Sequence, residues 1–442
     1  MDAIQSAPWL IAMARVFEDA GQPLYLVGGA VRNPLIGLPI SDVDVCGPAR
    51  PEEVCTLCEG TPVRAHLRAA HFGTVELHIA DAEGAHFMAE YTTFREDSYR
   101  CGHKPDAVRF TTDINVDAFR RDFSVNALYH RITTRGLEPL IDPTGGLGHL
   151  RAGVLHTVTS DPNQVLKDDG LRVLRAVRFQ AELDLRPTPA LLASMCTHAP
   201  LLADIACERL RDELQKVLLA DERYPMLKRR KPATASGLRT LRSIGAWPLL
   251  FDGFAWQEDT VRAMENVPGL PARLALLLWQ SSRAVKSEAQ VLNDAEVVSA
   301  ALHKLHFSNR DTEATALIAN VIALAAQGTL SRFEAAQAGA QACIGAADVL
   351  SSLARTNPAR HGEAATRARA LRDWILLPST PRSLRELAVN GSDIASLCER
   401  YGRKPHEIGE TLTALWRAVL EGGVPNEREA LLCEAVEQLQ RP

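Results

Sequence analysis

The 442-residue sequence is poor in aromatic side chains and contains no long apolar run. Aromatic residues make up only 5% of the chain, so the core must depend on leucine, alanine and valine, as in a mostly helical protein. No apolar segment approaches the roughly 20 residues that cross a bilayer. The N-terminus lacks a basic segment followed by an apolar one, which a secretory signal would need. We therefore expect a cytoplasmic protein without a membrane partner.

Neither sign of charge is in strong excess, and the cysteines follow no ligand pattern. The chain has 49 lysines and arginines against 54 acidic residues, which gives a formal charge of −5. This balance excludes a uniformly basic nucleic-acid binder but allows a local basic groove. The 9 cysteines are scattered, and Cys55 and Cys58, which have metal-like spacing, lack a second pair of ligands. We expect reduced thiols, and no feature indicates a protein partner.

The pattern of the sequence changes after the turn-forming segment 142–146. Before it, apolar runs of strand length alternate with helical patterns. Helices are expected over 8–20 and 30–36, and strands over 24–27, 41–46, 74–80, 87–93, 108–110 and 138–141. Beyond it, helical periodicity dominates, with strong helices over 165–183 and 205–219. The pattern predicts an α+β protein, in which a head of mixed sheet and helices is followed by an elongated all-α neck, body and tail.

The strongest local motif is a Gly-Gly turn followed by two carboxylates. Gly28 and Gly29 lie between a short apolar strand and a helix that carries Arg32, and Asp42 and Asp44 follow on the next expected strand. Side chains at i and i+2 of a strand point to the same face, so the two carboxylates would lie side by side. Two negative charges at such a short distance favour a cation between them, and carboxylate oxygens are hard ligands that suit Mg²⁺. The glycines let backbone N–H groups approach a phosphate, and Arg32 would add a charge-assisted contact.

This motif and several later segments, in the same order, resemble the class II CCA-adding tRNA nucleotidyltransferases. That family contains bacterial and eukaryotic enzymes and belongs with the bacterial poly(A) polymerases in the polymerase-β-like superfamily. The later segments are 90–95, 120–128, 142–146 and 168–179, with segments 389–393, 408–409 and 425–427 resembling the tail of the family. The resemblance implies a polymerase-β-like nucleotidyltransferase head. It also implies template-independent addition of C-C-A to the 3′ end of tRNA from CTP and ATP, with release of pyrophosphate.

The resemblance further implies a set of catalytic and nucleotide-binding residues. Asp42 and Asp44 would bind two Mg²⁺ ions, and Glu90 would be the third carboxylate of the catalytic set. The chemistry would be in-line attack of the RNA 3′-hydroxyl on the α-phosphorus, in which positioning and charge neutralisation provide most of the catalysis. The segment around Arg121 resembles the ribose and triphosphate contact of the family. Gly28, Gly29, Arg32, Asp122 and Asn126 complete the expected nucleotide contacts.

Four charged residues at regular spacing are candidates for reading the nucleotide base. Asp169, Arg172, Arg175 and Arg178 recur every third residue of an expected helix, so neighbouring side chains lie on one stripe. Arginine offers only donors and an ionised aspartate only acceptors. Cytosine and adenine both present a ring-nitrogen acceptor beside an amine donor, whereas uracil and guanine reverse this pattern. An Arg/Asp pair would therefore select C and A, and an ordinary surface salt bridge is the alternative for the motif in isolation.

Two basic stretches are candidates for contacts with RNA. The stretch 94–109 resembles the flexible loop that full CCA-adding members use when they switch from C to A. Its basic residues are Arg95, Arg100, His103, Lys104 and Arg109. A second run consists of Lys228, Arg229, Arg230 and Lys231. This run would contact the tRNA backbone, since phosphate contacts need no particular base, and a solvated surface is the alternative for both stretches.

The chain is long enough for about two to four domains of ordinary size. The sequence predicts a catalytic nucleotidyltransferase head over 1–153 and a helical neck that recognises the base over 154–223. A helical body over 224–356 and a helical tail over 357–442 would bind tRNA.

Other functions compete with this interpretation. Within the same class, the alternatives are a partial enzyme that adds only CC or only A, and a bacterial poly(A) polymerase. The segment 64–73 lacks the Gly-Arg-Arg-Phe type sequence of those polymerases, which argues against the second. A protein of another class would bind RNA without catalysis, and intact Asp42, Asp44 and Arg121 argue against it. A metal-dependent phosphohydrolase module is rejected, because the sequence has no adjacent His-Asp pair.

Overall fold

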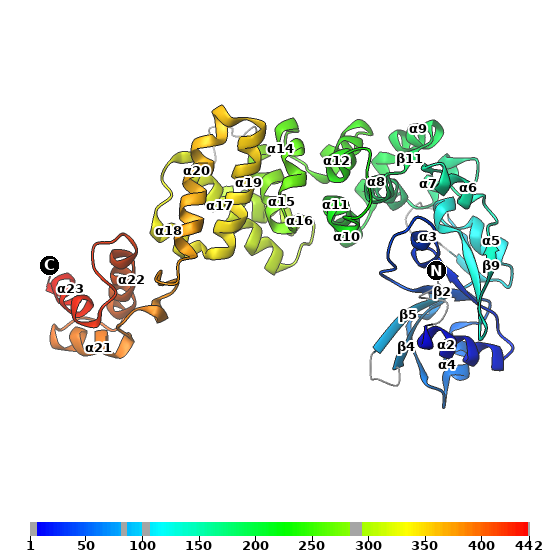
Figure 1. Cartoon of the computed structure of the whole chain (residues 1–442), viewed down its shortest axis with the longest axis horizontal. Coiled ribbons are helices and arrows are strands. Elements are labelled where there is room, and N and C mark those ends of the chain that lie inside the picture. Colours follow the sequence, from blue (N-terminus) through cyan, green and yellow to red (C-terminus); the bar gives the residue numbers. More distant parts are fainter. Residues whose placement is uncertain (1–6, 81–85, 100–106, 283–293, 441–442) are drawn as a thin grey trace. The chain divides into compact units, whose positions relative to one another are not determined.

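The computed structural model of the chain describes residues 7–80, 86–99, 107–282 and 294–440. The chain forms two compact units, Met1–Asp252 and Gly253–Pro442, which Figure 1 colours from blue to red along the sequence. The first unit combines a sheet with helices, and the second is helical in its described part. The α+β class predicted from the sequence is therefore confirmed. Within the described residues, no helix is both long enough and apolar enough to span a bilayer.

A seven-stranded sheet in the described part of the first unit forms the centre of the head, in the order β3-β4-β5-β2-β1-β8-β9. Its strands are β1 (Leu24–Val27), β2 (Asp44–Gly47), β3 (Val63–Ala69), β4 (Thr74–Ala80), β5 (His86–Thr93), β8 (Tyr129–Thr133) and β9 (Gly136–Ile141). Neighbouring strands are antiparallel except β2 and β5, which run parallel with Asp44 opposite Glu90. This one parallel pair brings together two acidic residues that lie far apart in the sequence.

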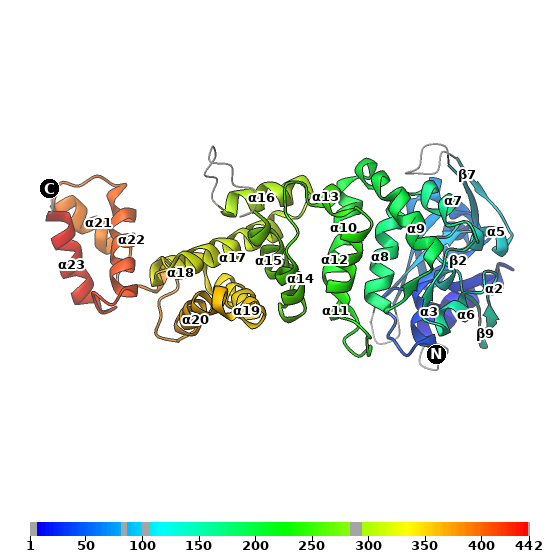
Figure 2. The same ribbon diagram turned by 90° about the horizontal axis from the view of Figure 1, so that it is seen from above.

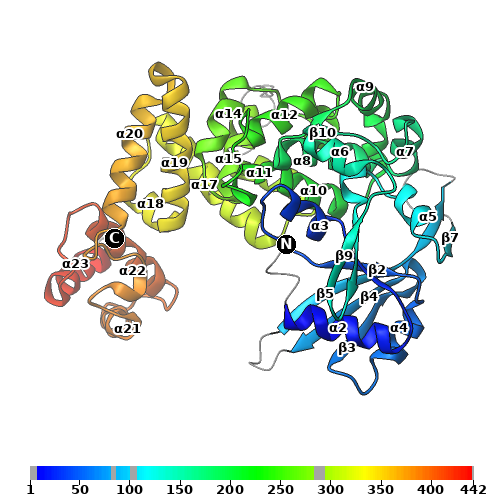
Figure 3. The same ribbon diagram turned by 45° about the vertical axis from the view of Figure 1, so that its right-hand side comes forward.

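Two helices cover one face of the sheet, α2 (Pro8–Asp19) and α4 (Pro51–Cys58) (Figure 3). Helix α2 buries Leu10, Met13 and Phe17, and the Phe17 ring lies 5.6 Å from the ring of Tyr91 on β5. Apolar side chains at helical spacing explain why this segment is a helix and which face it buries. The predicted helix over 8–20 is thereby confirmed to within one residue.

Short elements connect the opposite face of the sheet to the rest of the unit. They are α3 (Gly29–Leu35), α5 (Ile114–Phe119), α6 (Gly146–Arg151) and the small hairpin of β6 (Arg95–Ser98) and β7 (Ala107–Phe110). A core of Cys46, Phe94, Ala118 and Tyr129 fills the space beneath them. The predicted strands agree with the structure except the one expected over 41–46, which begins only at Asp44. Strands β3, β6 and β8 were not predicted from the sequence.

Helices follow from residue 162 to the end of the first unit. They are α7 (Pro162–Asp168), α8 (Leu171–Leu183), α9 (Pro189–His198), α10 (Cys207–Leu218), α11 (Ala220–Arg223), α12 (Ala233–Ser243) and α13 (Trp247–Leu250). The parallel pair β10 (Val154–Leu155) and β11 (Arg186–Pro187) flanks α7 and α8 in the sequence. Helices α10 and α12 both pack against α8 (Figure 2). Gly237 of α12 permits this close packing, because a Cβ there would lie 2.9 Å from the Val217 side chain.

The single helix expected over 165–183 is interrupted, which corrects the sequence prediction. Helix α7 ends at Asp168, Asp169 is extended with φ −144° and ψ 107°, and α8 begins at Leu171. A Cβ at Gly170 would lie 2.7 Å from the Leu201 side chain, so only glycine fits at this close approach. Helical periodicity continues across the break, which explains why the sequence pattern concealed it.

The second unit consists of ten helices in its described part. They are α14 (Glu258–Ala263), α15 (Leu270–Ser282), α16 (Asp294–Lys304), α17 (Asn309–Gln327), α18 (Arg332–Ala338), α19 (Ala340–Thr356), α20 (Pro358–Ile375), α21 (Gly391–Arg400), α22 (Glu407–Leu420) and α23 (Arg428–Gln440). The last three surround a core that contains Ile394, Leu415 and Trp416 and extends to Phe333 of α18. The predicted domain border at 223/224 falls inside the first unit, because α12 packs on α8. The fourfold division of the chain stays a prediction.

Candidate active site

A cleft of about 1010 Å³ lies in the first unit between the sheet and helices α8, α10 and α11. Its walls include every residue predicted to be catalytic or to bind the nucleotide. These are Gly28, Gly29, Arg32, Asp42, Asp44, Glu90, Arg121, Asp122, Asn126, Asp169, Arg172, Arg175 and Arg178. They come from segments separated by up to 150 residues, so their convergence is a property of the tertiary structure. The run 228–231 does not line the cleft.

Three carboxylates lie on the sheet side of the cleft. Asp44 begins β2 directly opposite Glu90 on β5, and the Glu90 N–H donates to the Val43 carbonyl at 2.9 Å. Asp42 precedes the strand in a bend, so the predicted shared strand face is wrong, although both carboxylates line the cleft. Burial raises the pKa of Asp44, and the nearby Asp42 charge raises it further. Burial and the Asp44 charge likewise raise the pKa of Glu90. The pocket thus concentrates negative charge that a cation would stabilise.

The Gly-Gly turn lies beside these carboxylates. Gly28 has φ +68°, a left-handed conformation that favours glycine, and a Cβ there would lie 3.4 Å from the Asp44 carboxylate. The guanidinium of Arg32 donates to the Asn33 side chain at 2.8 and 3.1 Å and to the side chain of Asn126. Burial lowers the pKa of Arg32 to about 10. These contacts hold α3 against the turn at 124–126, so Arg32 is well placed to position the site.

Arg121 is anchored by a buried carboxylate that the sequence analysis missed. Asp117 on α5 is fully buried and accepts from Arg121 at 2.9 Å and from Arg120 at 2.7 Å. The Tyr129 hydroxyl also donates to Asp117, at 3.0 Å. Spacings of three and four residues between Asp117 and the two arginines were the signal that could have found it. The network fixes Arg121 at the floor of the cleft.

Asp122 connects the head to helix α8. It accepts from the side chain of Asn126 at 3.2 Å and from the Phe123 N–H at 2.7 Å. Arg175 donates to the other oxygen through two nitrogens, at 2.6 and 2.7 Å. Burial alone would raise the pKa of Asp122, but the charges of Arg175 and Arg172 outweigh it and hold the pKa below its usual range. The predicted sugar site and the predicted base-reading helix therefore form one connected network.

The four residues predicted to read the base all line the cleft, but they do not form one continuous stripe on a helix. Asp169 lies in the break before α8 and pairs with Arg209 at 2.8 Å. Arg172 donates to the carbonyls of Val165 at 3.0 Å and Arg120 at 2.8 Å.

Arg178 of α8 is buried and contacts one carboxylate of its own helix and one of α10. Its guanidinium lies 2.5 Å from Glu213 and 3.0 Å from Glu182. The sequence analysis missed Glu213 and Arg209, because nothing local connects α10 with α8. Asp169 and Arg172 remain the candidates for base recognition, since Arg178 is committed to buried carboxylates.

Two residues of the basic run 228–231 have partners within the protein. Arg229 donates to the carbonyls of Ala220 at 2.8 Å, Tyr224 at 3.0 Å and Glu182 at 3.2 Å. The backbone N–H and the side chain of Arg230 both contact the Asp184 carboxylate, at 2.9 and 2.8 Å. Lys228 and Lys231 are exposed. The two lysines are therefore the better candidates for contacts with phosphate.

We expect Arg229→Ala to lower the free energy of unfolding by about 2–4 kcal/mol, because it removes the charged donor that connects three carbonyl groups of different segments. Lys228→Ala, at an exposed neighbouring position, should change it by less than about 0.5 kcal/mol. Urea denaturation of both variants tests this contrast. Equal stability of the two variants would contradict the structural role of Arg229.

The loop predicted over 94–109 is described only at its two sides. Arg100, His103 and Lys104 lie outside the described residues. Arg95 of β6 lies 2.9 Å from Asp97, and Arg109 of β7 lies 3.3 Å from Glu96.

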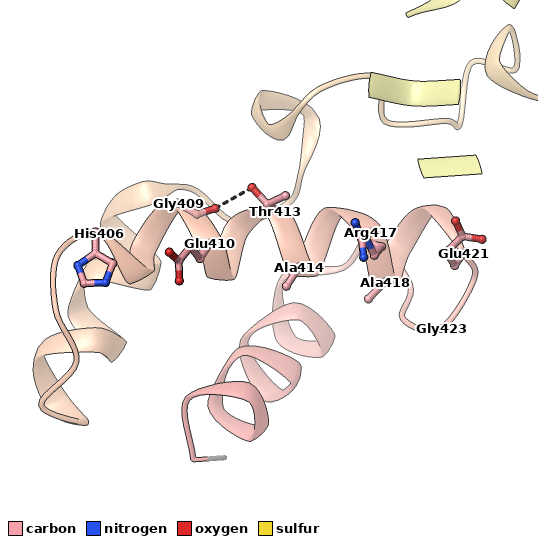
Figure 4. A pocket seen from close by; sticks show the side chains of 9 residues that line it. All are labelled: His406, Gly409, Glu410, Thr413, Ala414, Arg417, Ala418, Glu421 and Gly423. Atoms are coloured by element: carbon pink, nitrogen blue, oxygen red, sulfur yellow. Dashed lines mark hydrogen bonds between the residues drawn. The ribbon is translucent and has the colours of Figure 1, made fainter. Parts of the chain in front are cut away.

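A second hollow, of about 870 Å³, lies along α22 in the second unit (Figure 4). It is lined by His406, Gly409, Glu410, Thr413, Ala414, Arg417, Ala418, Glu421 and Gly423. Its single arginine lies over the Phe333 ring, 4.1 Å from the ring centre. The lining comes from one helix and its ends, with no converging network of the kind in the head. We therefore assign the chemistry to the cleft of the first unit.

The fold and the cleft define a nucleotidyltransferase: a glycine turn, neighbouring carboxylates on a mixed sheet and an arginine-rich helical wall. The family model of the poly A polymerase head domain matches residues 24–156. Models of the RNA- and SrmB-binding site of polymerase A and of tRNA nucleotidyltransferase domain 2 match 184–229 and 281–435.

Comparison with individual proteins identifies the family. The CCA-adding enzyme of Geobacillus kaustophilus is 30% identical, covering 97% of this chain and 96% of that protein. The CCA-adding enzyme of Lactiplantibacillus plantarum is 31% identical, with 94% and 92% covered. The crystal structure of the Bacillus stearothermophilus CCA-adding enzyme in complex with CTP superposes with a TM-score of 0.72 at 27% identity, covering 97% and 96%. The chain belongs to the family of CCA-adding enzymes.

Proposed function

We propose that the protein adds C-C-A to the 3′ end of tRNA without a nucleic-acid template, using CTP and ATP and releasing pyrophosphate. The observation that carries this proposal is the convergence of all the predicted catalytic and nucleotide-binding residues in one cleft. Similarity to CCA-adding enzymes over nearly the full length supports it. The protein would act in the cytoplasm, where tRNA and nucleoside triphosphates are available.

Mg²⁺ is the proposed cofactor, held by Asp42 and Asp44 with Glu90 beside them. Asp44 lies opposite Glu90 on neighbouring strands, and burial, with a smaller contribution from neighbouring carboxylate charge, raises the pKa of both groups. A cation would offset both effects, so the residues fit a cation site. Within the described residues, no three acidic, histidine or cysteine side chains lie close enough to hold a metal ion together, so Asp42 and Asp44 would supply the protein ligands. Nucleotide phosphates and water would complete the ligand set, as is usual for Mg²⁺. When bound, the ions would activate the 3′-hydroxyl and neutralise charge on the leaving pyrophosphate.

The side chains of the protein would hold the reactants for in-line displacement. The oxygen of the RNA 3′-hydroxyl, which gives up its proton to solvent, would form a bond to the α-phosphorus. The bond between the α-phosphorus and the oxygen that bridges to the β-phosphate would break, and pyrophosphate would leave. Arg121, fixed by Asp117, would present its charge to the triphosphate, and Asp122 and Asn126 would contact the ribose. Binding both reactants in one cleft converts a bimolecular step into an effectively unimolecular one.

Asp169 and Arg172 would recognise the base. An arginine donor and an aspartate acceptor complement the edge that C and A share, and U and G present the opposite pattern. Asp169 contacts Arg209, and Arg172 contacts two backbone carbonyls, so both side chains are held at the wall of the cleft.

We expect Arg172→Ala to lower the preference for CTP and ATP over UTP and GTP by about tenfold or more, because one bidentate contact discriminates by about 1–3 kcal/mol. Slow incorporation should persist, since the carboxylates lie on other elements. Single-nucleotide incorporation with each of the four triphosphates measures the effect. A uniform loss of rate with unchanged preference would assign Arg172 a structural role only.

The proposed function is tested by incubating the protein with tRNA that lacks its terminal C-C-A, with ATP and CTP separately and together. Sequencing of the products should show C-C-A and no further addition. Arrest after two C additions would indicate the partial enzyme, and long A tracts on unrelated RNA would indicate a poly(A) polymerase. Binding without incorporation would indicate an RNA-binding protein.

The basic surface and the helical second unit are proposed to bind the body of the tRNA. Lys228 and Lys231 are exposed and would contact phosphates, whereas Arg229 and Arg230 are engaged with the protein. A phosphate contact makes affinity fall as salt rises.

A further inference from the structure

Arg223, at the end of helix α11, reaches across the cleft to one of the proposed metal ligands. Its guanidinium lies 3.0 Å from the Ser41 hydroxyl and 3.4 Å from the Asp42 carboxylate. Ser41 also donates to the same carboxylate oxygen at 3.0 Å. Asp42 is 78% exposed, so this ion pair lies at the solvent side of the site. The carboxylate therefore has a cationic partner within the protein.

A second carboxylate stands on the other side of the same guanidinium. Glu182 of α8 is buried, and its Oε2 accepts from Arg178 at 3.0 Å. Its Oε1 is buried without a hydrogen-bond partner, and it lies 3.8 Å from the Arg223 Nε atom. That Nε lies 3.3 Å from the Tyr224 hydroxyl. A small movement of the guanidinium would thus satisfy a buried oxygen that otherwise lacks a partner.

The two contacts of the Arg223 guanidinium, with Asp42 and with Glu182, differ in their exposure to water. The contact with Asp42 is exposed and screened by water, as in the surface ion pairs that contribute little. The contact with Glu182 would be made in a buried environment, where an unpaired polar atom is costly and a charge-assisted hydrogen bond is strong. The guanidinium is thus shared between two carboxylates, 3.4 Å from Asp42 and 3.8 Å from Glu182. A cation at Asp42 takes over the exposed carboxylate and repels the guanidinium, which would then move the remaining distance to the buried Glu182 oxygen.

We propose that Arg223 is a positioning residue that neutralises Asp42 in the nucleotide-free protein and turns to Glu182 when a divalent cation occupies the carboxylates. This inference rests on the metal site of the proposed function. Arg223 thereby keeps the exposed acidic bend in place without a metal ion. Because the arginine must leave Asp42, it also sets how tightly the carboxylates bind a cation.

The test is a titration of the nucleotide-free full-length protein with Mn²⁺, with free Mn²⁺ measured by electron paramagnetic resonance. Arg223→Gln should tighten Mn²⁺ binding by about two- to fivefold, the effect of removing one exposed ion pair. Lys216→Gln is the matched control, since Lys216 lines the same cleft and carries the same charge but pairs with Glu213, at 3.4 Å. Its effect should be clearly smaller.

Glu182→Gln gives a second and opposite expectation. Without an anionic alternative, Arg223 stays on Asp42, so Mn²⁺ should bind more weakly than to the wild type. In the Arg223→Gln background the same change should have no effect on Mn²⁺ affinity. Thermal unfolding shows whether each variant is folded. If Glu182→Gln fails to fold, the comparison of Arg223→Gln with Lys216→Gln still decides the matter.

Asp42→Ala separates failure of this inference from failure of the proposed metal site. Unchanged Mn²⁺ binding in Asp42→Ala would overturn the metal site itself. Weakened binding in Asp42→Ala together with equal affinities of Arg223→Gln and Lys216→Gln would overturn only the role of Arg223. An effect of Glu182→Gln that persists without Arg223 would overturn it as well.

Discussion

Replacing Asp44 with asparagine should lower the rate of nucleotide incorporation by about 10³-fold or more, the effect of removing a main electrostatic group from an active site. Asp44 begins β2 opposite Glu90, and its carboxylate lies beside the Gly28 turn. Asparagine keeps the shape and one oxygen but removes the charge that would hold the cation. Single-turnover incorporation of CTP into tRNA that lacks its end measures the loss.

The same variant should be at least as stable as the wild type, which distinguishes a catalytic role from a structural one. Burial and the neighbouring Asp42 charge raise the pKa of Asp44, so its charged form opposes folding at neutral pH. Removing the charge relieves this repulsion. Glu138→Gln, at a carboxylate on β9 that is 45% exposed, is the control and should keep full activity. An Asp44→Asn protein with one tenth of wild-type activity would disprove the assignment.

Asp117→Ala should lower the free energy of unfolding by about 3–5 kcal/mol, because it leaves two buried or half-buried arginines without their shared carboxylate. Asp117 is fully buried and contacts Arg120, Arg121 and Tyr129. Nucleotide affinity should fall together with stability, since Arg121 loses its anchor. Urea denaturation and CTP binding measure the two effects.

The pH dependence of stability provides a second test of the same network. Burial alone would raise the pKa of Asp117, but Arg121 and Arg120 outweigh it and lower the pKa below its ordinary value of 3.8. The folded protein therefore binds this proton less tightly than the unfolded chain does. The stabilisation by Asp117 is complete above pH 3.8 and is lost as the pH falls through the lowered pKa. In Asp117→Asn, the free energy of unfolding should fall less between neutral and acid pH than in the wild type. An unchanged dependence on acid pH would argue against the ion pairs.

The sequence by itself determined the local features of the head. Apolar runs of strand length located β1, β4 and β5, and apolar spacing located α2. The Gly-Gly turn before two aspartates indicated a phosphate and cation site, because the residues that would form such a site lie close together in the sequence. The ordered set of motifs indicated the family for the same reason. Strand β3 was missed since most of its side chains are exposed, which leaves no apolar pattern.

Only the tertiary structure decided which distant residues act together. The parallel pairing of β2 with β5 places Glu90 beside Asp44, and strand pairing is not encoded in either segment alone. The same holds for Glu213, which holds Arg178, and for Arg229, whose partners are backbone carbonyls of other segments. Side-chain charge can be read along a chain, but its partner is set by long-range packing. For that reason the sequence supplied the chemistry of the site, and the fold supplied its connections.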